Sequence, residues 1–160
     1  MIRNILEYLE ATAARLPDKI AFSDDKTSIS FRDMEEKSKR IGSYLLHPGR
    51  RNRPIAVMMQ KTPILAAAFL GCVYSGNFYT PIDPTMPKER MLSVLHTLEP
   101  QLLLIDEKSR KAAEALGYAG EICVLEEILD TPIKEDMLAE IRLRAIDTDP
   151  LYALFTSGST

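Results

Sequence analysis

The last five residues of the chain, Thr156-Ser157-Gly158-Ser159-Thr160, have the composition of a loop that holds an anion. Glycine and small side chains let successive backbone N–H groups converge into an anion-binding concavity, and the hydroxyl groups add hydrogen-bond donors. The polyphosphate of a nucleotide is the ligand that this chemistry favours. A serine-rich linker has the same composition, so these five residues alone leave both interpretations open.

A short apolar run, residues 151–155, comes directly before this loop and has the length of a buried strand. Other apolar runs of strand length lie at 54–59, 78–83, 101–105 and 121–125. Segments with helical periodicity separate them, so the sequence predicts an α/β fold with a mostly parallel sheet and helices on both faces. Ligands of such sheets bind at the carboxyl ends of the strands, where the loop after residues 151–155 would lie.

The first third of the chain predicts a helix, a short β-hairpin and a second helix. Apolar residues recur at helical spacing over 5–16, and Pro17 ends that helix. Residues 19–31 alternate around a turn at Asp24 and Asp25, which predicts the hairpin. Ser30, three residues before Asp33, has the spacing of a helix cap.

Two surface segments are also predicted. Residues 126–149 are acidic and contain Pro132, which indicates an irregular surface excursion. Arg50, Arg51 and Arg53 follow a Pro-Gly pair, and their setting is typical of a solvated loop.

Composition excludes several classes of function. The net charge of -3 argues against a protein that holds nucleic acid on a basic face. Cys72 and Cys123 each lie within an apolar stretch, which predicts buried, reduced thiols. The longest apolar run, residues 63–76, is shorter than the roughly 20 residues that span a bilayer. Neither histidine has the companions of a metal site. We therefore expect a cytoplasmic protein without a metal site of its own and without a membrane partner.

Three segments in order carry a resemblance to a known family. The sequence LYALFTSGST resembles the phosphate-binding core motif of the AMP-forming adenylating enzymes, which continues Gly-x-Pro-Lys-Gly after the final threonine. Upstream, ISFRDMEEKSKRIGSYL and FLGCVYSGNFYTPIDPTMPKERM resemble the first and second core motifs. Positions that match the second motif are Ser75, Gly76, Tyr79, Pro81, Asp83, Pro84, Pro87 and Arg90. The departures are small: Asn77 stands where a small or apolar residue is commoner, and Phe155 where tyrosine is.

The resemblance implies that residues 1–160 are the N-terminal portion of the large adenylation domain. This superfamily includes acyl- and aryl-CoA synthetases, adenylation domains of nonribosomal peptide synthetases, D-alanine–carrier-protein ligases and luciferases. Thr156, Ser157, Gly158, Ser159 and Thr160 would hold the phosphates of ATP, with Mg²⁺ as counter-ion. The substrate carboxylate would attack the α-phosphate and release pyrophosphate. The acyl-AMP would then pass to the thiol of phosphopantetheine or coenzyme A.

The form of the second motif is closer to amino-acid-adenylating members, so the expected substrate is an amino acid and the expected partner is a carrier protein. In the family, the catalytic lysine, the magnesium-holding glutamate and the adenine contacts lie further along the chain. We therefore expect no catalytic residue within this fragment, no activity from it alone, and self-association through an exposed sheet edge. An acyl-CoA synthetase and a non-catalytic scaffold of the same fold are the alternatives. Asp83 is expected to be a turn or cap residue.

Overall fold

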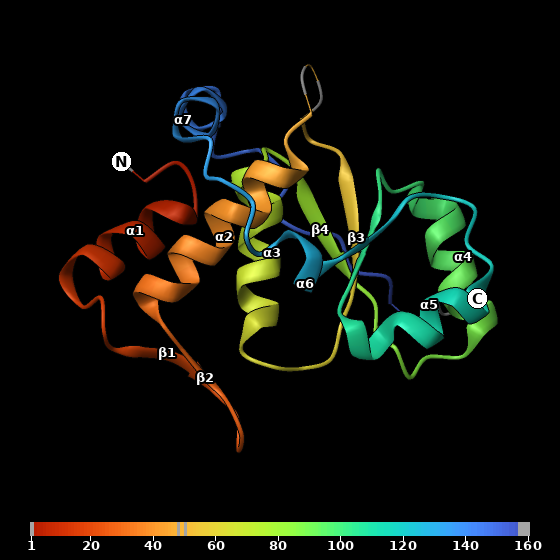
Figure 1. The fold of residues 1–160 in the computed structure, drawn as a ribbon. Coiled ribbons are helices and arrows are strands. Elements are labelled where there is room, and N and C mark those ends of the chain that lie inside the picture. The colour runs from red at the N-terminus through yellow and green to blue at the C-terminus, as the bar shows by residue number, and fades with distance from the viewer. Residues whose placement is uncertain (1, 48, 50, 157–160) are drawn as a thin grey trace.

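The computed structural model describes residues 2–47, 49 and 51–156, and a four-stranded sheet lies at its centre (Figure 1). Its strands are β3 (Pro54–Met58), β4 (Phe78–Pro81), β5 (Leu103–Ile105) and β6 (Ile122–Val124). They lie in the order β4-β3-β5-β6, and every neighbouring pair is parallel. The predicted α/β class with a parallel sheet is confirmed.

Both faces of this sheet are buried, because the strands are apolar at successive positions that point to opposite sides. The residues that pack on one face are Ile55, Val57, Leu104 and Cys123. The residues that pack on the other face are Ala56, Met58, Leu103, Ile105 and Val124. The chain therefore builds two separate cores, one on each side of a single layer of strands.

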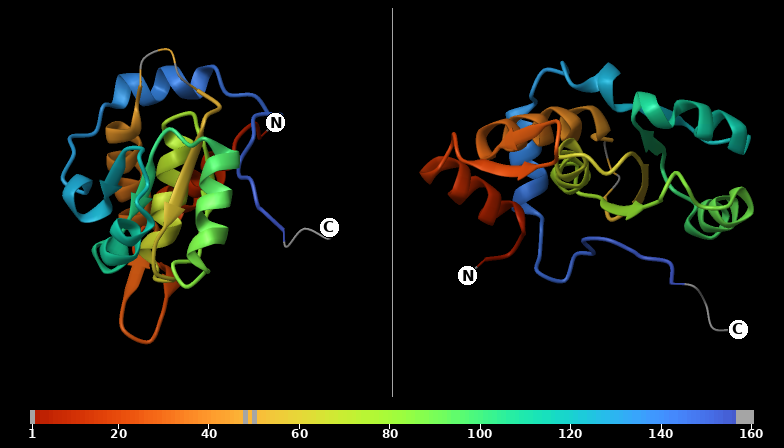
Figure 2. Two further views of the ribbon diagram at one scale, coloured as in Figure 1. Left: turned by 90° about the vertical axis from the view of Figure 1, so that its right-hand side faces the viewer. Right: turned by 90° about the horizontal axis from the view of Figure 1, so that it is seen from below.

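Helices cover the two faces unequally. The first core is covered by α1 (Leu6–Arg15), α2 (Phe31–Leu45) and α3 (Ile64–Tyr74), and the second by α4 (Lys88–Leu98) and α5 (Arg110–Leu116). Figure 2 shows these two layers on opposite sides of the sheet. Helices α2 and α3 cross closely because Gly42 and Gly71 meet there; a Cβ atom on Gly71 would lie 2.5 Å from Cγ2 of Ile41.

The predicted hairpin is also present and extends away from the sheet (Figure 2). Its strands, β1 (Ile20–Ser23) and β2 (Ser28–Ser30), pair antiparallel. Asp24 Oδ1 accepts hydrogen bonds from the backbone N–H groups of the turn at distances of 2.8 and 2.6 Å. Ser30 Oγ accepts from the Asp33 N–H at 3.1 Å, so the predicted cap opens α2.

The segment 126–149 is more regular than its composition predicts. It contains most of α6 (Leu125–Ile128) and all of α7 (Glu135–Leu143), so the expectation of irregular structure is wrong for these residues. Leu138 of α7 is buried in the first core. Arg142 of the same helix donates to Glu10 of α1 at 2.7 Å, which joins the segment to the N-terminal helix.

The two cysteines are free and buried, as predicted. Burial raises the pKa of the Cys123 thiol to about 12 and raises that of Cys72 as well. Both thiols therefore stay protonated at neutral pH and act as packing groups. Across residues 2–47, 49 and 51–156, no helix is both long enough and apolar enough to cross a membrane.

Candidate functional site

The segment that leads to the predicted phosphate loop lies beside β4. We call residues 151–155 the terminal segment. The Tyr79 N–H donates to the Leu151 carbonyl at 3.3 Å, and the Ala153 N–H donates to the Tyr79 carbonyl at 3.0 Å. These bonds form a parallel bridge between Tyr79 and Tyr152. The terminal segment therefore runs in the same direction as β4 and ends at the same edge of the sheet.

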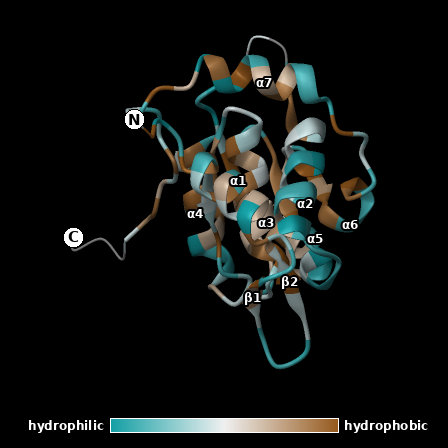
Figure 3. Ribbon diagram, turned by 90° about the vertical axis from the view of Figure 1, so that its left-hand side faces the viewer, coloured by the Kyte–Doolittle hydropathy of each residue, from teal (hydrophilic) through white to brown (hydrophobic). Residues whose placement is uncertain are grey.

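The pairing is short, and the prediction of a full strand over residues 151–155 is wrong in this respect. One isolated bridge joins the terminal segment to the sheet. A ring contact supplements it: the Tyr152 ring lies tilted at 5.9 Å from that of Tyr79, between centroids. The Tyr79 ring in turn stacks on that of Phe69 at 4.2 Å. Exposed hydrophobic side chains remain, with Tyr152 at 53%, Leu154 at 61% and Phe155 at 37%. Figure 3 shows this apolar stretch on the outside of the domain.

The carboxyl edge, meaning the edge where the parallel strands end, carries a first polar group beside β4. Asp83 Oδ1 accepts from the Thr85 N–H at 2.9 Å and from the Thr85 hydroxyl at 2.7 Å. These donors hold the pKa of the Asp83 carboxyl below its ordinary value. Lys61, which follows β3, lies 3.6 Å from the other carboxylate oxygen. Asp83 is thus a turn residue, as predicted.

A second polar group lies between β3 and β5, where the strand order changes direction. The carboxylate of Asp106 accepts from the Gln60 N–H and from the Ser109 N–H, each at 2.9 Å. This bridge ties the loop after β3 to η1 (Glu107–Ser109). In doubly wound sheets such a switch point is where ligands commonly bind. Here a side chain of the protein, 5% exposed, fills it.

Of the five predicted phosphate-binding residues, the structure describes one. Thr156 is exposed at the end of the terminal segment, on the carboxyl edge. Ser157, Gly158, Ser159 and Thr160 lie outside the described residues. The position of Thr156 agrees with the expectation that the loop begins at the carboxyl ends of the strands.

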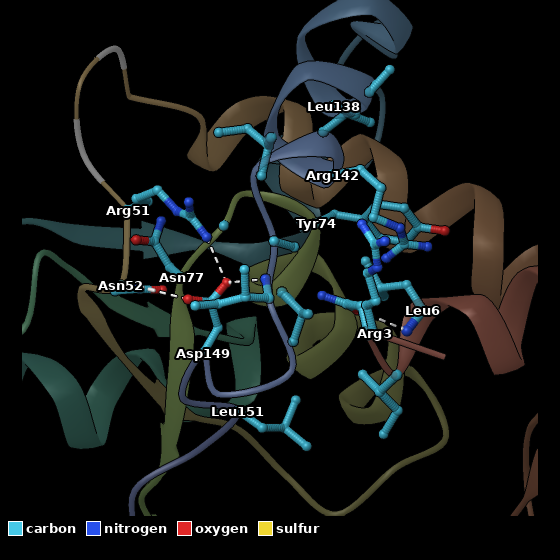
Figure 4. A pocket seen from close by; sticks show the side chains of 18 of the residues that line it. Arg3, Leu6, Arg51, Asn52, Tyr74, Asn77, Leu138, Arg142, Asp149 and Leu151 are labelled. Carbon is cyan, nitrogen blue, oxygen red and sulfur yellow. Dashed lines mark hydrogen bonds and ion pairs between the residues drawn. The ribbon is translucent and has the colours of Figure 1, made fainter. Parts of the chain in front are cut away.

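A pocket of about 370 Å³ lies at the opposite, amino edge of the sheet (Figure 4). Helices α1 and α7 and residues 145–151 form its walls. Its principal charges are already paired: Arg142 with Glu10 at 2.7 Å, and Arg51 with Asp149 at 2.5 Å. These ion pairs join the walls of the pocket, which lies at the opposite edge of the sheet from Thr156.

One member of the arginine cluster differs from its predicted role. Arg53 is exposed in a loop, as predicted, and Arg50 lies outside the described residues. Arg51 is only partly exposed, and it donates to the carboxylate of Asp149 and to the Arg144 carbonyl. Sequence reasoning missed this contact, since the two partners are 98 positions apart and no local pattern relates them. Within the part of the chain that the structure describes, no cluster of three or more metal-binding side chains occurs.

These features define a doubly wound α/β domain that carries its final segment to the ligand-binding edge of the sheet. The chain belongs to the family of AMP-binding enzymes, whose model matches residues 9–160.

Similar proteins agree with this assignment. The chain is 31% identical to a plipastatin synthase of Bacillus subtilis over 98% of its own length and 6% of that protein. It is 29% identical to a D-alanine–D-alanyl carrier protein ligase of Listeria welshimeri over its full length, which is 32% of the ligase. In fold, it matches a four-domain nonribosomal peptide synthetase bound to AMP and glycine, with a TM-score of 0.78, 21% identity and coverage of 96% of this chain and 11% of that one. The chain thus spans a third or less of each of these three proteins.

Proposed function

We propose that residues 1–160 form the N-terminal part of the large adenylation domain of an ATP-dependent acid–thiol ligase. The observation that carries this proposal is the parallel bridge to β4, which directs the terminal segment and Thr156 to the carboxyl edge. The family match supports it independently. In this proposal a carboxylic acid is activated as acyl-AMP with release of pyrophosphate, and the acyl group then passes to a phosphopantetheine or coenzyme A thiol.

The proposed role of Thr156, Ser157, Gly158, Ser159 and Thr160 is to hold the phosphates of ATP. Their backbone N–H groups and hydroxyls supply donors, and bound Mg²⁺ supplies charge neutralisation when present. Reaction then depends on positioning the α-phosphate in line with the substrate carboxylate. We assign no catalytic side chain within the chain, and we propose that these 160 residues alone are inactive.

An amino acid is the substrate class that the relatives favour. Plipastatin synthase and the D-alanine–D-alanyl carrier protein ligase match over nearly the whole chain. By analogy with the name of the second, we propose a carrier protein as the acceptor partner. ATP and such acceptors are components of the cytoplasm, where we place the activity. The alternative activity is acyl-CoA synthesis. Assays with different acids and with a carrier protein or coenzyme A as acceptor distinguish the two activities.

We expect the longest polypeptide that the gene encodes around this chain to catalyse amino-acid-dependent exchange between ATP and pyrophosphate. Gly158→Val is expected to lower the exchange rate about 100-fold or more. The valine side chain would keep the backbone N–H groups away from the phosphates, and loss of one such hydrogen-bond donor to a transition state typically lowers a rate by about this factor. Thr97→Val, at an exposed position of α4, is the control and leaves the rate unchanged. A Gly158→Val protein with wild-type exchange would refute the loop assignment, and a reading frame that stops at Thr160 would favour a scaffold.

The exposed terminal segment predicts self-association of the 160-residue chain. Leu154 is 61% exposed on a strand-like segment at the edge of the sheet, and unpaired apolar edges associate. Sedimentation velocity is expected to show concentration-dependent oligomers that Leu154→Lys reduces. Leu143→Lys, at an 84% exposed position of α7, is the matched control and leaves association unchanged. A monomer at every concentration would contradict this prediction.

A further inference from the structure

We propose that Asp149 is a positioning residue, which fixes the register of the terminal segment on β4 and thereby the place of the phosphate loop. The expected effect on catalysis rests on the proposed function. The anchoring of the terminal segment does not, because it is inferred from contacts among residues that are well away from the loop.

Three donors converge on the Asp149 carboxylate (Figure 4). Arg51 Nη2 donates to Oδ2 at 2.5 Å, and Asn52 Nδ2 donates to Oδ1 at 3.0 Å. The Ile146 N–H donates to Oδ2 at 3.0 Å. The Asp149 side chain is 17% exposed, so water competes weakly for these bonds. Charge-assisted hydrogen bonds of this kind are about twice as strong as neutral ones.

Asn52, a partner of Asp149, and its neighbour Arg53 are bonded to the segment before β4. The Asn52 N–H donates to the Gly76 carbonyl at 2.8 Å, just before β4. The Arg53 N–H donates to Asn77 Oδ1 at 3.1 Å, just before β3 begins. The anchor therefore ties together three chain segments at the amino edge: the one before β3, the one before β4, and the one before the terminal segment.

This anchor matters because the other contacts of the terminal segment are few: one bridge to β4, the ring contact of Tyr152 with Tyr79, and the packing of Leu151 on the first core. Two residues after Asp149, the Leu151 carbonyl accepts the first bond of the single bridge to β4. A slip of one residue would move Thr156 by about 3.3 Å and turn its side chain to the other face. Misplacement of a reacting group by about 1 Å can reduce a rate roughly 100-fold. The contacts of Asp149 at the amino edge thus determine where Thr156 lies at the carboxyl edge.

Hydrogen exchange tests the anchor without reference to activity. In the longest polypeptide that contains this chain, Asp149→Ala is expected to reduce protection of the Ala153 amide about 10-fold or more, because that amide depends on the register. The Ala56 and Leu103 amides, which bond within the central sheet, keep their protection. Asp147→Ala is the matched control, since this exposed aspartate lies two residues away and leaves the Ala153 amide unchanged.

Kinetics tests the catalytic consequence. Asp149→Ala is expected to raise the KM for ATP about 10-fold and lower kcat, with the KM for the amino acid unchanged. Partial loss of folded protein would lower kcat alone, so the KM for ATP separates positioning from stability. Asp149→Asn keeps one acceptor and is expected to recover part of the loss. If the alanine protein does not fold, the KM for ATP and the protection of the Ala153 amide are measured in Asp149→Asn instead.

Two results would overturn the proposal. Full protection of the Ala153 amide in Asp149→Ala would show that Asp149 does not hold the terminal segment. Lost protection with an unchanged KM for ATP would show that the segment does not position the phosphate loop. A wild-type protein without exchange activity counts against the proposed function instead, and the amide measurement then still decides whether Asp149 is an anchor.

Discussion

Gly71→Val is expected to lower the free energy of unfolding by about 3 kcal/mol, one of the largest effects available in this chain. A Cβ atom at this position would lie 2.5 Å from Cγ2 and 2.7 Å from Cβ of Ile41, and 3.3 Å from the Ser38 carbonyl oxygen. Two of these atoms belong to or adjoin the backbone of α2, so a rotamer change cannot relieve the contact. The two helices would have to separate, which would open the first core.

Urea unfolding measures this effect, with Gly71→Ala as a milder variant. Alanine adds only the Cβ atom and gains about 1 kcal/mol of helix propensity, so its net loss is expected to be smaller. Ala14→Val is the control, because Ala14 is exposed on α1 and the change there costs only about 0.6 kcal/mol of propensity. A valine variant as stable as wild type would mean that α2 and α3 do not cross at this glycine.

Asp106→Ala is expected to lower the free energy of unfolding by about 3 kcal/mol as well. The substitution leaves the N–H groups of Gln60 and Ser109 without the carboxylate that both donate to at 2.9 Å. The Ser109 N–H keeps its 3.0 Å bond to the Asp106 carbonyl, so the Gln60 N–H is the donor left unsatisfied. An unsatisfied buried donor costs about 1–3 kcal/mol. Since the carboxylate joins the loops after β3 and β5, we also expect the Gln60 amide to exchange faster. Urea unfolding and hydrogen exchange measure the two effects.

Asp106→Asn separates the contribution of the acceptors from that of shape. Asparagine keeps one acceptor oxygen and the same outline, so its loss is expected to be about half that of alanine. Lys108→Gln, at an exposed position of the same turn, is the matched control and leaves stability within about 0.5 kcal/mol. Equal stability of the alanine and wild-type proteins would contradict the bridging role of Asp106.

Local patterns were sufficient to predict most of the architecture. Apolar runs separated by helical periodicity predicted the parallel sheet, and the spacing of Ser30 and Asp33 predicted the cap of α2. Residues 126–149 were mispredicted because acidic residues and Pro132 obscured α7, in which Leu138 is the one buried residue. Where a helix docks through one buried side chain, its apolar pattern is too weak to reveal it.

The candidate site was less accessible to the same reasoning. The loop composition and its place after a strand predicted the carboxyl edge, where Thr156 lies. The contact between Arg51 and Asp149 joins residues 98 positions apart, and it depends on how α7 returns the chain to the amino edge. Pairings of this kind follow from the tertiary path, so a single sequence does not contain a local signal for them.

The adjacent rings of Phe69, Tyr79 and Tyr152 have a practical consequence for spectroscopy. The chain has no tryptophan, so its near-ultraviolet signals come from tyrosine and phenylalanine alone. Ring pairs held at 4.2 and 5.9 Å give chirally ordered chromophores, and Tyr152 belongs to the terminal segment. A tryptophan introduced as Tyr152→Trp would be the sole indole fluorophore in these 160 residues. Its emission would report, in real time, when the segment that leads to the phosphate loop docks on the sheet and when it leaves.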